Sequence, residues 1–108
     1  MSLGHEQEQF TKDLVKLLSK ALELGYEVRM GEVLRPVEMQ ELYVKTGRSK
    51  TMNSMHIKKC AADIHFFKDG TLCYPEELGK YWESLSTENQ WGGNWKSFKD
   101  QPHFERHI

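Results

Sequence analysis

The feature that most constrains this chain is a turn signal near its middle. The segment AADIHFF, residues 61–67, is separated from TLCY, residues 71–74, by a lysine and the dipeptide Asp69-Gly70. An Asp-Gly pair between two apolar segments favours a two-residue turn with positive φ at both positions, and such turns join antiparallel strands. The chain is therefore expected to contain an antiparallel β-hairpin at this point.

The turn also predicts the register of the two strands and the state of the cysteines. Lys68 faces Thr71 in this register, and Phe66 faces Cys73. Cys60 lies six residues further along the strand than Phe66, which is beyond the span of a disulfide to Cys73. Both cysteines are predicted to be free thiols.

Helical patterns flank the hairpin. An apolar stripe over residues 6–24 predicts an amphipathic helix that ends at Gly25, and its members are Phe10, Leu14, Leu17, Leu18, Ala21 and Leu22. A second helix is expected over residues 36–46 and a third from Pro75 onward. A strand is expected over 26–34, and short strands and turns over 91–108. Helices and antiparallel strands in separate blocks predict an α+β fold, a small antiparallel sheet packed with about three helices.

Length and charge narrow the classes of function. A chain of 108 residues is one ordinary domain, and residues 1–5 are expected to be disordered or a remnant of expression. The formal net charge of −1 gives no electrostatic case for a nucleic-acid partner. No apolar run approaches the roughly 20 residues that span a bilayer, and the polar start MSLGHEQEQF lacks the features of a secretory signal. We therefore expect synthesis in the cytoplasm, or a signal that was removed.

The histidines are the residues that point to chemistry. His56 precedes Asp63 by seven residues, and His103 follows Asp100 by three. Two imidazoles and one carboxylate form a three-ligand zinc set that leaves a fourth position for water, and Asp100 is then available as a base. Taken singly, each histidine is more typical of a surface or hydrogen-bonded core position. His65 is the main rival ligand, because it lies on the same face of the strand as Asp63.

The segment WGGNWKSFKDQPHFE is unusual for residues that only pack. It places two glycines between Trp91 and Trp95, and a D-x-x-H turn follows. Glycine in a strand often marks the close approach of a ligand or of another backbone segment. Core packing accounts for the two tryptophans equally well.

Three segments carry a resemblance to a known family. SMHIKKCAAD resembles the S-x-H-x6-D motif of the LAS zinc metallopeptidases, which share a hedgehog/DD-peptidase-like fold. WGGNWKSFKDQPHFE is similar to the closing segment of that family, and LRPVEMQELYVKTGRSK resembles its R-x-x-E-x-Q element. The similarity covers residues 25–106 and is greatest to the phage and prophage endolysin branch, whose members typically cut between L-Ala and D-Glu in peptidoglycan stem peptides.

The resemblance implies a role for each matching residue. His56, Asp63 and His103 are expected to bind one Zn²⁺, and Asp100 to take a proton from the zinc-bound water and pass it to the leaving amine. Arg35 matches an arginine that stabilises the oxyanion or holds a substrate carboxylate.

Five further residues are candidates for contacts with the substrate or with the metal ligands. By resemblance or by strand alternation, they are Ser54, Gln40, His65, Trp95 and Glu105. Two departures from the family pattern are Lys59, where many members have glycine, and Asn94, where relatives often have aspartate.

The prediction is a single catalytic zinc peptidase domain over residues 1–108, a monomer that acts on peptidoglycan peptides without inserting into a membrane. Attack by zinc-bound water at the L-Ala–D-Glu bond is the favoured reaction. The alternatives are a D-Ala-D-Ala carboxypeptidase or dipeptidase of the same fold, and an inactive zinc-stabilised binding module. An enzyme of this kind made in the cytoplasm needs a partner such as a holin to reach the wall.

Overall fold

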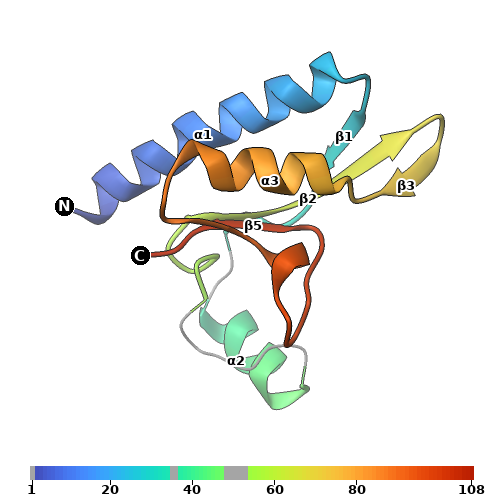
Figure 1. Cartoon of the computed structure of the whole chain (residues 1–108). Coiled ribbons are helices and arrows are strands. Elements are labelled where there is room, and N and C mark those ends of the chain that lie inside the picture. The colour runs from blue at the N-terminus through green and yellow to red at the C-terminus, as the bar shows by residue number, and fades with distance from the viewer. Residues whose placement is uncertain (1, 35–36, 48–53) are drawn as a thin grey trace.

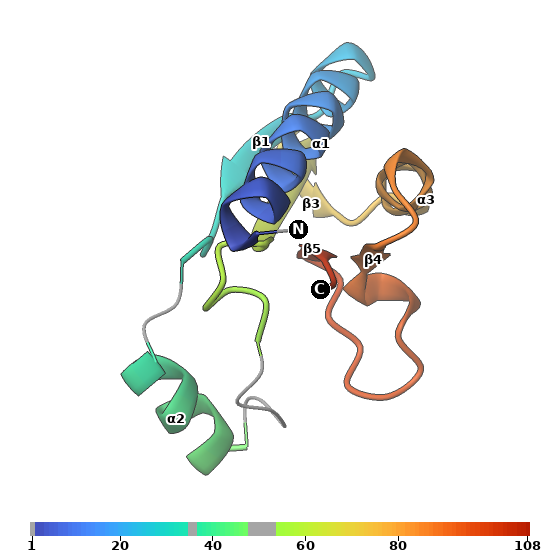
Figure 2. The same cartoon turned by 90° about the vertical axis from the view of Figure 1, so that its left-hand side faces the viewer.

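The computed structural model describes residues 2–34, 37–47 and 54–108. The elements in chain order are α1 (Leu3–Glu23), β1 (Glu27–Met30), α2 (Val37–Lys45), β2 (Ala61–Lys68), β3 (Thr71–Cys73), α3 (Glu76–Leu85), β4 (Asn89–Trp91), the 3₁₀ turn η1 (Gly92–Asn94) and β5 (His103–Arg106). Three helices and a small antiparallel sheet confirm the predicted α+β class. Helices α1 and α3 lie on one side of the sheet, and α2 stands apart on the other (Figures 1 and 2).

The strand order is β1-β2-β5-β4, with β3 paired to β2, and every pairing is antiparallel. The hairpin has the predicted register, because Lys68 faces Thr71 and Phe66 faces Cys73. Asp69 and Gly70 have φ of 53° and 77°, as a two-residue turn of this kind requires. Strand β2 therefore forms the centre of the sheet, in contact with three other strands.

Helix α1 begins earlier than the sequence indicated. Ser2 caps it by accepting a hydrogen bond from the backbone N–H of His5, so residues 3–5 are helical and not disordered as expected. The helix ends as predicted: the N–H groups of Gly25 and Tyr26 bond back to the carbonyls of Leu22 and Ala21, and Gly25 has a φ of 89°.

The hydrophobic core lies between the sheet and helices α1 and α3. Its buried members are Phe10, Leu17, Ala21, Ala62, Ile64, Phe66, Leu78, Trp82, Trp91 and Phe104. Leu22 was expected in the buried stripe but is 63% exposed. Asp13 is buried instead, because its carboxylate accepts hydrogen bonds from Ser86 and Asn89.

We predict opposite effects for two helical glycine-to-alanine changes. A Cβ at Gly79, inside α3, would overlap the indole of Trp91, whereas the nearest atom to a Cβ at Gly4, in α1, is Ser2 Oγ at 3.9 Å. Gly79→Ala should therefore lower the free energy of unfolding by about 1–3 kcal/mol despite better helix propensity. Gly4→Ala should raise it by up to about 1 kcal/mol. Urea unfolding of both variants tests this, and a Gly79→Ala protein as stable as the parent would contradict the packing described.

Candidate metal centre

His56 lies in the turn that precedes β2. Its backbone N–H bonds to the Ser54 hydroxyl at 3.2 Å, and Cys60 N–H closes the turn on the carbonyl of Met55 at 2.9 Å. The imidazole is 1% exposed, and its Nδ1 lies 3.1 Å from the carbonyl oxygen of Val33. That carbonyl can only accept, so Nδ1 carries the proton and Nε2 is left as a metal-binding atom.

Asp63 and His103 are brought together by strand pairing. Asp63 on β2 is directly opposite His103 on β5, so both side chains project from the same face of the sheet. The backbone of Asp63 is also held on its other side, by Gly31 N–H at 2.7 Å and the carbonyl of Glu32 at 2.8 Å. The backbone of Asp63 is therefore held by β5 on one side and by the segment that follows β1 on the other.

The orientation of the His103 ring is fixed by Glu105. His103 Nε2 lies 2.7 Å from Glu105 Oε1, and Glu105 Oε2 lies 2.8 Å from His107 Nδ1. Because the carboxylate accepts the Nε2 proton, Nδ1 of His103 is the atom that faces the site. The sequence predicted that Glu105 contacts the substrate or the metal ligands, and the structure places it beside His103, while His107 is 53% exposed.

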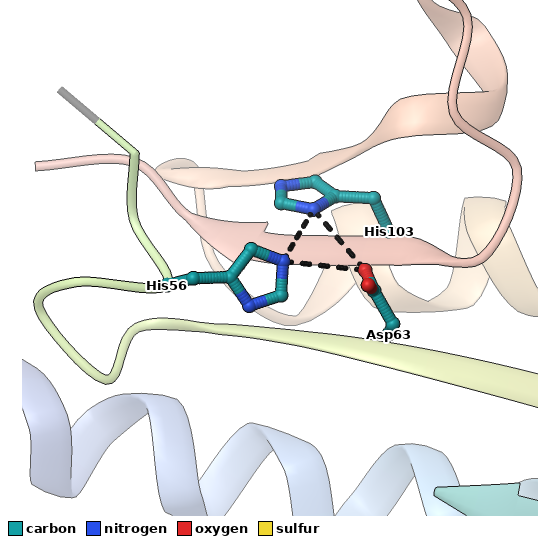
Figure 3. Close-up of side chains that lie close together, drawn as sticks. All are labelled: His56, Asp63 and His103. Carbon is teal, nitrogen blue, oxygen red and sulfur yellow. Dashed lines mark hydrogen bonds and ion pairs between the residues drawn. The ribbon is translucent and has the colours of Figure 1, made fainter. Parts of the chain in front are cut away.

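The three candidate ligand atoms converge, as Figure 3 shows for His56, Asp63 and His103. His56 Nε2 is 3.1 Å from His103 Nδ1 and 3.2 Å from Asp63 Oδ1, and His103 Nδ1 is 3.5 Å from Asp63 Oδ1. Ligand atoms at tetrahedral angles around zinc, each at its usual bond length, lie about 3.3 Å apart. Asp63 Oδ1 is buried and makes no hydrogen bond of good geometry with either ring. Spacing, donor types and this unsatisfied oxygen all fit a zinc ion.

The electrostatics of the cluster favour a cation. Burial alone would raise the pKa of Asp63, but the two imidazoles outweigh it and hold that pKa well below its usual range. Burial alone would lower the pKa of His103, yet its contacts with Asp63 and Glu105 and the charges of Glu105 and Asp100 raise it to about 9. In the metal-free protein, the positive charge of protonated His103 therefore takes the place of the charge that a bound metal ion would supply.

Asp100 and Trp95 border the same ring. Asp100 Oδ2 lies 3.9 Å from His103 Nδ1, and the Asp100 side chain is 43% exposed. Its backbone is held by Gly92, where any Cβ would overlap the Asp100 carbonyl oxygen. The Trp95 ring is tilted against His103 at a centroid distance of 5.0 Å. Asp100 thus faces the cluster from its solvent side.

The remaining predicted residues are more distant or differently placed. Arg35 lies outside the described residues. Gln40 is fully buried although the rest of α2 is largely exposed. Nδ1 of His65 lies 3.3 Å from the hydroxyl of Tyr74, and His65 is not part of the ligand cluster. Both cysteines are free thiols, as predicted, and Cys60 is buried near the carbonyl of Lys58.

Sequence reasoning missed two contributors to the site, the Val33 carbonyl and Tyr74. Tyr74 follows β3, its hydroxyl lies 3.3 Å from Nδ1 of His65, and its pKa is raised by burial and by the charges of Asp100 and Asp63. The backbone carbonyl of Val33 carries no side-chain signal at all. Tyr74 could have been found by extending the hairpin register one residue past Cys73.

The sequence profile of an M15 peptidase family, described as D-alanyl-D-alanine carboxypeptidase, matches residues 47–106. The chain therefore belongs to the M15 peptidase family, which confirms the resemblance seen in the motifs.

Two relatives are more specific. The chain is 35% identical over 95 residues to the L-alanyl-D-glutamate peptidase of Listeria phage A118, an alignment covering 83% of this chain and 34% of that protein. It thus spans about a third of the length of this relative. The crystal structure of the L-Ala D-Glu endopeptidase ChiX of Serratia marcescens has a TM-score of 0.68 and 26% identity, covering 94% of this chain and 85% of that one.

We predict that Glu105→Ala weakens zinc binding by about 10–100-fold, because the His103 ring loses the acceptor that fixes it. Competition with a chromophoric chelator measures the affinity. Glu41→Ala, on the exposed side of α2, is the control and should bind zinc like the parent. Equal affinities in both variants would remove Glu105 from the metal site.

The metal-free protein should lose stability as the pH rises from about 6.5 to 9. His103 has a raised pKa, about 9 against 6.5, so its stabilising contribution is complete below 6.5 and is lost as the proton leaves. The loss should be on the order of 3 kcal/mol. Zinc-loaded protein should not show this loss, because the metal needs deprotonated ligands. Thermal unfolding across this pH range, with and without zinc, distinguishes the two; parallel curves would contradict the assignment.

Proposed function

We propose that this chain is a zinc-dependent peptidase that hydrolyses peptidoglycan stem peptides at the bond between L-Ala and D-Glu. The observation that carries the proposal is the convergence of two imidazole nitrogens and a carboxylate oxygen at tetrahedral spacing beside Asp100. The names of the phage and Serratia relatives supply the bond. The 43% exposure of Asp100 beside the cluster also supports it, because a substrate can reach the cluster from that side.

His56, Asp63 and His103 would hold one Zn²⁺ per chain. Bound there, zinc would polarise the scissile carbonyl and lower the pKa of water toward 7. Val33 and Glu105 would orient the histidine ligands, because each fixes the tautomer of one histidine. The protein thus supplies a rigid ligand set and a fixed direction of approach.

Asp100 is proposed as the general base and acid. Its carboxylate is partly exposed and lies at the edge of the cluster, where it can take a proton from the attacking water and return it to the leaving amine. Its backbone is held by two hydrogen bonds, from its N–H to Gly92 and to its carbonyl from His103 N–H. These bonds hold the backbone of Asp100 beside the ligand ring.

The other predicted residues are proposed as supports. Trp95 covers one side of the His103 ring and would exclude water from it. Arg35 is assigned the stabilisation of the oxyanion, or of a substrate carboxylate, by its resemblance to the family arginine. Ser54 shapes the His56 turn through its hydroxyl, and Gln40 and His65 are proposed to contact the substrate or the ligands.

A second candidate function follows from the family description, which names D-alanyl-D-alanine carboxypeptidases. The same ligand set and base would serve that bond. An inactive zinc-stabilised module is disfavoured, because the carboxylate of Asp100 is in place beside the cluster.

The site of action follows from the substrate. Within the described residues, no helix is both long enough and apolar enough to cross a bilayer. We propose that the protein acts at the cell wall as a monomer. It would reach the wall with the help of a release partner of the holin type or by means of a secretion signal.

The test is mass spectrometry of muropeptides incubated with zinc-loaded protein, beside Asp100→Asn and Glu76→Gln. Glu76 is an exposed carboxylate on α3 that forms an ion pair with Lys80, so its variant should keep full activity. Asp100→Asn should lower the rate by about 10²–10⁴-fold.

The fragments identify the bond that is cut. New amino-terminal D-Glu would establish the L-Ala–D-Glu bond, and released D-Ala would move the specificity to the carboxypeptidase. If zinc-loaded protein leaves the muropeptides intact, the peptidase proposal is wrong and a binding module is favoured.

A further inference from the structure

The two faces of β2 differ in burial. Ala62, Ile64 and Phe66 point into the core beneath α1 and α3 and are fully or almost fully buried. Asp63, His65 and Phe67 alternate with them and lie on the opposite face, where all three are partly exposed. The metal centre therefore stands at one end of a sheet face that α1 and α3 leave uncovered (Figure 1).

A polar pair follows directly beyond the metal centre on this face. His65 is two residues from Asp63, about 7 Å along the strand, and its ring nitrogen Nδ1 meets the Tyr74 hydroxyl at 3.3 Å. Burial, and after it the charges of Asp100 and Asp63, raise the pKa of this hydroxyl. His65 and Tyr74 thus form a polar pair next to the metal centre on this face.

The side chain of Arg29 lies beyond this polar pair on the same face of the sheet. Arg29 on β1 is directly opposite His65, and its guanidinium carbon lies 4.2 Å above the centre of the Phe67 ring. Stacking on an aromatic ring holds the guanidinium flat and leaves its donors free for a planar acceptor such as a carboxylate. Among the described residues no carboxylate forms an ion pair with Arg29, although Glu27 lies on the same face, opposite Phe67.

The separation along the sheet defines what this cation can reach. Phe67 is four residues from Asp63, which is about 13 Å in an extended strand. A guanidinium above Phe67 therefore lies about four residues of extended chain from Asp63, because an extended chain spans at most about 3.3–3.6 Å per residue.

We propose that this uncovered face of β1, β2 and β3 binds the part of the substrate on the D-Glu side of the cleaved bond, and that Arg29 recognises a carboxylate there. The proposal rests on the proposed function and specifies its substrate class. The D-Glu side is the acidic side of the bond, because D-Glu has a second carboxyl group and the peptide ends in another. The L-Ala side brings no such charge. Arg29 is thus a specificity-determining residue, continuous with the metal centre through His65 and Tyr74.

The test compares two peptides of sequence L-Ala–D-Glu–X–X that differ only in whether the carboxyl groups beyond the cleaved bond are free or amidated. Zinc-loaded parent protein should cleave the free form with a kcat/KM about 10–100-fold higher, as a charge-assisted hydrogen bond allows. Arg29→Gln should cleave both forms at the rate at which the parent cleaves the amidated one. Arg29→Lys should keep part of the preference.

Lys80→Gln is the matched control, because Lys80 is 70% exposed on α3, and it should retain the full preference of the parent. Equal cleavage of both peptides by the parent, or an unchanged preference in Arg29→Gln, would overturn the proposal. Circular dichroism of each variant before assay establishes that it is folded.

Binding of the product fragment separates this proposal from the function on which it rests. Calorimetric titration with the fragment that begins at D-Glu should give an affinity about 10-fold or more lower in Arg29→Gln than in the parent. If the parent cleaves neither peptide but shows this Arg29-dependent binding, the peptidase proposal fails and the binding face stands. If cleavage occurs and binding is independent of Arg29, the reverse holds.

Discussion

The structure depends on the pairing of β2 with β5, in which Asp63 is directly opposite His103. The two residues are 40 positions apart in the sequence, and this one ladder brings them to a common face. The same ladder places Ala62 against Phe104 on the other face, within the hydrophobic core. A slip of one residue would send the carboxylate into the core and an apolar side chain to the metal centre. Core packing and site geometry therefore enforce the same register.

Features set by residues close together in the sequence could be predicted, whereas features set by residues far apart in the sequence could not. The hairpin register was predictable because two adjacent residues, Asp69 and Gly70, determine it. The candidate ligands were recognisable because their spacing is local within each motif. Tertiary partners were not predictable. Leu22 was expected in the core but is exposed, and Asp13 is buried because Ser86 and Asn89, more than 70 residues away, bond to it.

The histidines show the same limit at the level of single atoms. The sequence indicates which imidazoles belong to the site but not which nitrogen of each faces it. That choice is made by the carbonyl of Val33 for His56 and by the carboxylate of Glu105 for His103. A backbone carbonyl leaves no trace in residue identity, so only the fold could reveal the first of these.

The different nitrogens have a consequence for where a metal ion would rest. Nδ1 of a histidine and Oδ1 of an aspartate are the same number of bonds from the backbone, so His103 and Asp63 extend equally far from the sheet. Nε2 of His56 is a longer arm that comes from a turn outside the strand ladder. An ion held by all three would link that turn to the sheet, so its binding would add to the hydrogen bonds that already hold His56 and the turn in place.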